Sequence, residues 1–212
     1  SYVVYKASEE FKNRRLIAKR LKVLGCRRIC RSFWEVDDER VNDVLKVLQG
    51  NEPILLKRLR EVRRSRFDRE NNLIDFGSLV VFVYKSGKKD RVDKIRALLK
   101  KAPCIRLCNG VYAFCQEPSF FESREVLIDA KLFWILAKEI DETIRVFPRI
   151  VIMNPESAVR LLEDVRMRIE KGINDVAVGY KTLYQKAING EVNEKDSRGE
   201  QMNLKRKFVL IK

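Results

Sequence analysis

The sequence predicts an α+β fold made of two similar halves followed by a helical extension. Each half opens with a short apolar run typical of a buried strand, Ser1–Lys6 and Leu79–Lys85, and each run is followed by an amphipathic helical segment. In addition, Cys26–Trp34 aligns without gaps on Cys104–Tyr112 at an offset of 78 positions. These observations indicate a tandem duplication.

The first half is expected to run strand, helix, hairpin, helix, strand. A basic helix is predicted over Phe11–Leu24, and it stops at Gly25 because glycine breaks helices. A hairpin follows in Cys26–Trp34. Apolar residues then recur at helical spacing in Asp38–Leu48, and Pro53–Arg60 is typical of a closing strand.

The second half repeats this order. A helix over Lys88–Lys101 ends before Pro103, the hairpin of Cys104–Tyr112 follows, a helix is predicted over Val126–Glu139, and Thr143–Ile152 closes the unit as a strand. Helices on one face of an antiparallel sheet in this order make a split βαβ unit. We therefore predict two tandem ferredoxin-like units with antiparallel sheets, plus a C-terminal helical extension.

Changes of composition suggest the boundaries of these parts. The first unit is expected at 1–60, a basic, charge-dense linker at 61–78 and the second unit at 79–153. A C-terminal helix is predicted at 154–189. The remainder, 190–212, is expected to be a polar loop with a basic tail, or a closing edge strand.

The C-terminal helix has a clear start signal. Asn154 is expected to cap it, with Pro155 at the first helical position. An apolar stripe from Val159 to Val176 must cover a sheet face or a partner. Gly172 and Gly179 predict an interruption or a bend.

The charge of the chain points to a polyanionic partner. There are 45 Lys+Arg against 30 Asp+Glu, a net charge of +15 and a pI near 9.7, so nucleic acid is the first expectation. The alternative is a solvated surface rich in intramolecular ion pairs. No apolar run is long enough to span a bilayer, so we expect no membrane association.

Histidine is absent, which excludes Ser-His and Cys-His catalytic pairs and histidine-ligated metals. The five cysteines form an odd set in apolar surroundings, which favours reduced thiols in a cytoplasmic protein. The Cys26–Cys30 and Cys104–Cys108 spacings allow a zinc site. Zinc ligands normally lie on turns, however, so small buried core residues are the preferred interpretation. We expect no metal and no cofactor.

Basic residues are densest in the first half and its linker. A lysine at the end of each opening strand suits a phosphate as a point charge, although it would equally solvate the strand end. Arginines favour planar contacts with phosphate oxygens, and non-specific duplex binding through the backbone is the natural expectation. The candidate nucleic-acid-binding residues are Lys6, Arg14, Arg15, Lys19, Arg27, Arg28, Arg31, Lys57, Arg58, Arg60, Arg63, Arg64, Arg66 and Lys85.

The first half carries a family resemblance. The strand Val3–Lys6, the basic helix Lys12–Leu24 and the strand Gly25–Glu35 resemble the small CRISPR-associated "Cas two" proteins of spacer acquisition. The match covers about the first 60 residues, and it reaches 79–152 only through the internal repeat. The resemblance implies a ferredoxin-like homodimer that holds double-stranded DNA beside an integrase, and some members are metal-dependent nucleases. A tandem duplication would make one chain the equivalent of that dimer.

The sequence departs from the family where the chemistry would be. Lys6 and Lys85 stand at the strand ends where the family carries a metal-binding aspartate, and an ammonium cannot ligate Mg²⁺. The resemblance therefore implies a non-catalytic scaffold for duplex DNA or RNA, with an integrase-like partner on the C-terminal helix. Two alternatives remain open. One is a metal-dependent nuclease using Glu9, Glu35 or Asp37, and the other is a protein-interaction or regulatory module.

Overall fold

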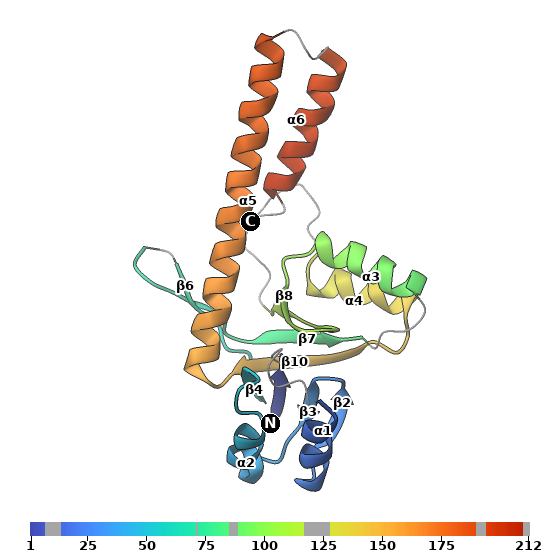
Figure 1. Cartoon of the computed structure of the whole chain (residues 1–212), viewed down its shortest axis with the longest axis vertical. Coiled ribbons are helices and arrows are strands. Elements are labelled where there is room, and N and C mark those ends of the chain that lie inside the picture. Colours follow the sequence, from blue (N-terminus) through green and yellow to red (C-terminus); the bar gives the residue numbers. More distant parts are fainter. Residues whose placement is uncertain (7–13, 71, 85–88, 117–127, 190–193, 210–212) are drawn as a thin grey trace.

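The chain folds as a mixed α+β protein around an eight-stranded antiparallel sheet, from which a pair of helices projects (Figure 1). The predicted α+β class is therefore confirmed. The structure is a computed structural model, and it describes residues 1–212 except 7–13, 71, 85–88, 117–127, 190–193 and 210–212. No helix in these described ranges is both long and apolar enough to cross a membrane.

The first half has the predicted order of elements. Its elements are β1 (Tyr2–Tyr5), α1 (Arg14–Val23), β2 (Arg27–Cys30), β3 (Phe33–Glu35), the 3₁₀ turn η1 (Asp38–Arg40), α2 (Val41–Val47) and β4 (Pro53–Arg58). The basic helix turns its apolar residues Ile17 and Leu21 inward, as its periodicity predicts. Residues 11–13 of the predicted helix lie outside the described ranges.

The second half repeats this order after a short hairpin. The hairpin consists of β5 (Arg66–Phe67) and β6 (Leu73–Asp75), and the half consists of β7 (Leu79–Val83), α3 (Lys89–Lys100), β8 (Ile105–Cys108), β9 (Val111–Cys115), α4 (Ala130–Ile140) and β10 (Arg145–Ile152). The segment expected to be a plain linker thus contains a two-stranded sheet of its own.

Both halves have the same strand order. The sheet runs β2-β3-β1-β4-β10-β7-β9-β8, so in each half the last strand lies beside the first and the second strand lies at an edge of the sheet. The halves join through β4 and β10, where Ile152 is opposite Leu56 and Ile150 is opposite Arg58. Every pairing in the sheet is antiparallel.

A bulge in β10 bends the sheet where the halves meet. The register shifts between Phe147 and Ile150, and Arg149 has a positive φ of 59°. Pro148 has no N–H to give to the ladder, and prolines in strands are found at bulges. Bulges increase local twist and bend the strand. The bend accompanies the folding of one half-sheet over the other.

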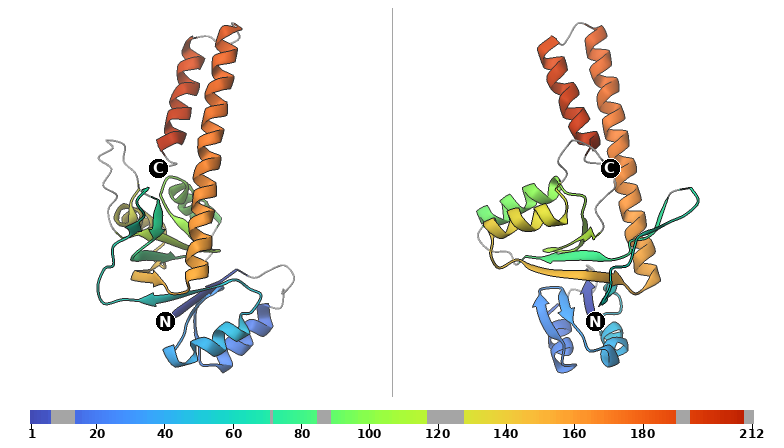
Figure 2. Two further views of the ribbon diagram at one scale, coloured as in Figure 1. Left: turned by 90° about the vertical axis from the view of Figure 1, so that its left-hand side faces the viewer. Right: turned by 180° about the vertical axis from the view of Figure 1, so that it is seen from behind.

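The two half-sheets pack face to face with helices outside. One buried cluster, here called the inter-sheet core, contains residues of both halves, among them Val4, Phe33, Val81, Leu107 and Ile150. Two further clusters lie under α1 and α2 and under α3 and α4, respectively. The helices accordingly lie on opposite outer sides of the strands (Figure 2).

Helix α5 (Pro155–Ile188) begins as predicted but is anchored differently. Asn154 makes no capping bond; its Oδ1 accepts from the N–H of Leu55 at 2.9 Å and its Nδ2 donates to the carbonyl of Pro53 at 3.2 Å. These bonds tie the helix start to β4. The helix continues through Gly172 and Gly179 without the predicted interruption, and α6 packs against it.

The prediction of a polar loop followed by a basic tail or an edge strand was wrong for residues 194–209. Helix α6 spans Glu194–Val209 and runs back along α5 (Figure 1). A Cβ at Gly179 would lie 2.4 Å from Cδ2 of Leu204, so the glycine permits this close approach. Leu204 of α6 and Val176 and Leu183 of α5 are buried in this pair of helices, whose stability comes from packing more than from helix propensity.

Candidate nucleic-acid interface

The outer face of α1 carries exposed basic residues, and the apolar side of the helix is buried. Arg15 and Lys19 are exposed, while Ile17 and Leu21 are buried beneath them. Within the described part of the chain, neither Arg15 nor Lys19 has a carboxylate at ion-pair distance. Arg14 begins the helix. The predicted basic face of α1 is therefore present and open to solvent.

Strand β2 and its turn carry the next group of arginines, each with a different environment. Arg27 pairs with Glu35 at 2.5 Å. Arg28 donates to the carbonyl of Cys30 at 3.1 Å and lies 5.6 Å from the centre of the Trp34 ring. Arg31 is exposed in the turn after β2. Arg31 has the most freedom of the three, since no ion pair holds it among the residues described.

The lysine that ends β1 is engaged by α5. Nζ of Lys6 lies 3.8 Å from Asp164, and both side chains are about half exposed (46% and 58%). An anion at Lys6 would have to compete with this carboxylate. Its counterpart Lys85 lies outside the described residues, so the predicted symmetry of the two lysines is a statement about sequence alone.

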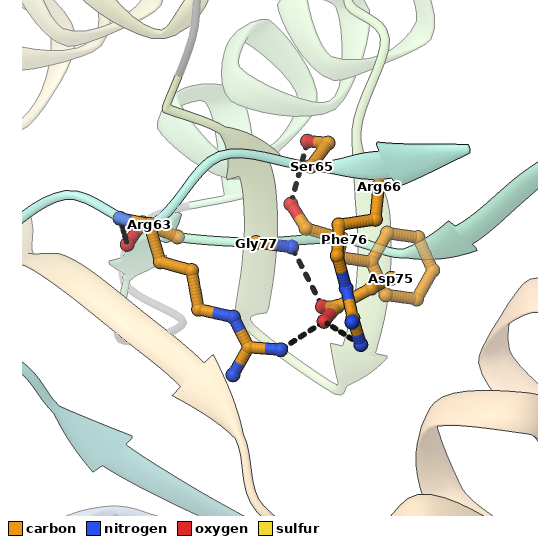
Figure 3. A network of polar contacts seen from close by, with 7 residues as sticks. Arg63, Ser65, Arg66, Asp75, Phe76 and Gly77 are labelled. Atoms are coloured by element: carbon orange, nitrogen blue, oxygen red, sulfur yellow. Dashed lines mark hydrogen bonds and ion pairs between the residues drawn. The ribbon is translucent and has the colours of Figure 1, made fainter.

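Two basic residues of the linker contact the same carboxylate. Asp75 accepts from Arg63 and lies 3.3 Å from Arg66, and its other oxygen accepts from the N–H of Gly77 at 2.9 Å (Figure 3). The hydroxyl of Ser65 donates to the carbonyl of Phe76 at 2.9 Å. Two of the predicted phosphate ligands therefore also hold the hairpin together.

Gly77 is required by this network. Its φ is +63°, and an added Cβ would lie 2.5 Å from the carbonyl oxygen of Arg63 and 2.6 Å from the nitrogen of Ser65. We expect Gly77→Ala to lower the free energy of unfolding by about 2–4 kcal/mol, because the left-handed backbone and the backbone clash add. Urea denaturation measures this loss, and trypsin should cut the linker faster.

Gly199 supplies the matched control for that substitution. It lies in α6 with nothing within 4 Å of an added Cβ. We expect Gly199→Ala to be neutral or to stabilise by up to about 1 kcal/mol, because alanine favours the helix. Equal losses in the two variants would show that the Asp75 network does not depend on Gly77.

The other predicted basic residues of this region lie in β4, just after it, or in the linker. Lys57 pairs with Asp38 at 3.0 Å, and hydrogen bonds from the Ser1 hydroxyl and from Lys57 lower the pKa of the Asp38 carboxyl. Arg58 and Arg60 are exposed, and so is Arg64.

Eleven of the fourteen predicted residues fall into two groups, and Lys6, Arg14 and Lys85 belong to neither. Arg15, Lys19, Arg27, Arg28 and Arg31 form the α1–β2 group, and Lys57, Arg58, Arg60, Arg63, Arg64 and Arg66 form the linker group. Strand β2, which carries Arg27 and Arg28, and strand β4, which carries Lys57 and Arg58, lie at opposite edges of the first half-sheet, with β3 and β1 between them. Three strand spacings separate them, roughly 14 Å.

Sequence reasoning missed Arg149 in the linker group. The β10 bulge brings its Nη1 to the carbonyl of Arg60 at 2.6 Å, while its N–H donates to Gln116 at 2.9 Å. Pro148 within a strand is the signal that could have located this bulge. Arg149 therefore adds a basic residue from the second half to the linker group.

Of the acids proposed for the nuclease alternative, Glu35 and Asp37 lie in the described part of the chain, and Asp37 precedes the 3₁₀ turn η1 without a side-chain capping bond. Glu35 is paired with Arg27, and Glu9 lies outside the described residues. Among residues that are described, no three Cys, Asp or Glu side chains could hold a metal ion together. The four cysteines of the two spaced pairs also do not form one cluster, because Cys26 and Cys104 lie in different helix-side cores.

These features define a mixed α+β protein with an eight-stranded sheet and exposed basic residues on its first half. Comparison with protein-family models, with curated proteins and with solved structures gave no match to the chain. Its function is therefore argued from the residues above.

Proposed function

We propose that this chain is a non-catalytic, cytoplasmic nucleic-acid-binding scaffold in which two tandem ferredoxin-like units replace the two subunits of a "Cas two"-like dimer. The shared strand order of the halves and the helices on their outer faces support the tandem units. The observation that carries the binding proposal is the α1–β2 group, in which Arg15, Lys19 and Arg31 are exposed on or beside a rigid helix.

Duplex is the preferred partner. Phe33 and Trp34 are fully buried, so neither ring is available to stack on a base. Contacts from guanidinium and ammonium groups to phosphates do not read sequence, which suits a scaffold. Strands β2 and β4, which carry part of each group, lie roughly 14 Å apart, a length that covers about eight duplex phosphate charges at one charge per about 1.7 Å of helix axis.

The halves differ in a way that makes binding one-sided. Arg31 of the first half corresponds to Asn109 of the second, and Arg27 corresponds to Ile105. A homodimer would present two equal basic faces. In this chain the duplex contacts are concentrated on the first half and the linker.

A lysine at the end of β1 and its pairing with Asp164 support a scaffold without metal-dependent cleavage. We place an integrase-like protein partner on the projecting helices. The feature that favours this location is a row on α5 in which Ile173, Tyr184 and Ile188 are 45–68% exposed.

The proposal is tested with labelled duplex, RNA hairpin and single strand across a salt series, with and without Mg²⁺. Duplex binding should weaken steeply with salt, by roughly 0.9 in log–log slope per neutralised phosphate, and the substrate should stay intact. Absence of binding at low salt contradicts the proposal. Tighter binding of single strands would instead point to Phe67, an aromatic residue of the linker hairpin that is 56% exposed.

A further inference from the structure

Cys30 and Cys108 are equivalent residues of the two halves, and they meet where the ends of the sheet come together. Cys30 ends β2 and Cys108 ends β8, which are the two terminal strands of the sheet. Both thiols belong to the inter-sheet core, with 9% and 4% of the residue exposed. Within this core the two side chains are near enough for each thiol to shift the pKa of the other. Folding thus brings together two thiols that the sheet order places at opposite ends.

The surroundings of the two thiols are unequal. Hydrogen bonds from Cys108 and from the backbone at Ser32 and Phe33, helped by the charge of Arg28, lower the pKa of Cys30 to about 6 despite its burial. The same contact with Cys30 raises the pKa of Cys108, with burial adding to it. A thiol of lowered pKa is the better nucleophile, which favours Cys30 over Cys108 for attack on an oxidant.

The other cysteines do not share this arrangement. Burial raises the pKa of Cys104 to about 11, and burial also raises that of Cys26. These two thiols lie in separate cores. Cys115 is exposed at the end of β9. They serve as internal controls for any reagent that attacks thiols.

We propose that Cys30 and Cys108 are a redox modification site, which hydrogen peroxide converts into a disulfide joining β2 to β8. The Cys30 thiolate attacks one peroxide oxygen, the O–O bond breaks, and the departing hydroxide becomes water with the proton that Cys30 released. The Cys108 sulfur then displaces hydroxide from the sulfenic sulfur, and its own proton makes the second water. Two electrons pass from sulfur to peroxide.

The test uses the full chain, treated with hydrogen peroxide without reductant, blocked with an alkylating agent and analysed by peptide mass spectrometry. We expect one intramolecular bridge between Cys30 and Cys108. Because the bridge closes a long loop, the Tm of the oxidised protein should rise by about 10 °C and return on addition of dithiothreitol.

Variants separate this site from general thiol oxidation. Cys30→Ser and Cys108→Ala should each abolish the bridge and the Tm rise, whereas Cys26→Ser should keep both. Cys115→Ser removes the exposed thiol that would link two chains. Three results with the wild type would overturn the proposal: oxidation confined to Cys115, over-oxidation of Cys30 without a bridge, or a bridge that lowers Tm. Because these results are obtained with the wild type, they decide the question even if a variant fails to fold.

The pH dependence identifies which thiol attacks. A thiol of lowered pKa becomes thiolate as pH rises through that pKa, so the rate of bridge formation should climb between about pH 5 and pH 7 and level above. Stopped reactions quantified by mass spectrometry give this profile. A rate that keeps climbing beyond about pH 8, as for an ordinary thiol, would contradict the assignment of Cys30.

Discussion

The triple variant Arg15→Glu, Lys19→Glu, Arg31→Glu is expected to bind a duplex of about 30 base pairs on the order of 10²–10³-fold more weakly than the wild type at about 0.1 M salt. These residues are exposed, and the structure gives them no carboxylate partner in the part it describes. Removing three phosphate contacts should also reduce the log–log salt slope by roughly 3. Fluorescence anisotropy across a salt series measures both quantities.

A charge-matched variant decides whether position or net charge matters. Lys171→Glu, Lys181→Glu, Lys205→Glu changes the same number of charges on exposed residues of the projecting helices. We expect a much smaller loss of affinity and a nearly unchanged slope. Circular dichroism of both variants checks the helix content. Equal losses would mean that the chain attracts polyanions through total charge, without an α1–β2 site.

Phe33→Ala is expected to lower the free energy of unfolding by about 3–5 kcal/mol, equivalent to a Tm decrease of roughly 10 °C. Phe33 is fully buried in the inter-sheet core, where its ring centre lies 5.3 Å from that of Phe147 and 5.6 Å from that of Tyr2. Because this cluster joins strands of both halves, the loss should affect the whole sheet in one transition. Calorimetry and urea denaturation measure it.

Hydrogen exchange distinguishes the inter-sheet core from the helix-side cores. Phe33→Ala should increase exchange in β7 as well as in its own half, because Val81 and Val83 belong to the same cluster. The control is Trp34→Ala, since Trp34 is the next residue of β3 but packs under α1 and α2. If Phe33→Ala leaves β7 exchange unchanged, the halves are energetically independent.

Much of the fold follows from local sequence. Apolar periodicity located the opening and closing strands and the helices of the two halves to within a few residues where they are described, because buried strands and helix faces leave local patterns. The joining of β4 to β10 left no such pattern, since any edge strand presents unpaired backbone groups. Helix α6 was missed for a related reason: its stability comes from contact with α5, and its own sequence is polar.

The sequence predicted which basic residues are exposed at the candidate site, but not which carboxylates pair with the others. Exposed bases on α1 were expected from the helical pattern, and they are exposed. The partners of other bases are set by tertiary structure: Asp164 reaches Lys6 from α5, and Asp38 reaches Lys57 from beyond β3. Similarly, the offset of 78 positions relates Cys30 to Cys108 in sequence, whereas only the folding of the sheet brings their thiols together.

The position of β10 also determines when the sheet can be finished during synthesis. The chain emerges N-terminus first, so β1 to β4 can pair before β10 (Arg145–Ile152) has been synthesised. Until then the edge of β4 that pairs with β10 is free. At ordinary translation rates that interval is roughly 5–20 s. For that time the nascent first half exposes an unpaired edge that another nascent chain can occupy. Crowded translation of the same message is therefore the condition under which this protein is most exposed to misassembly.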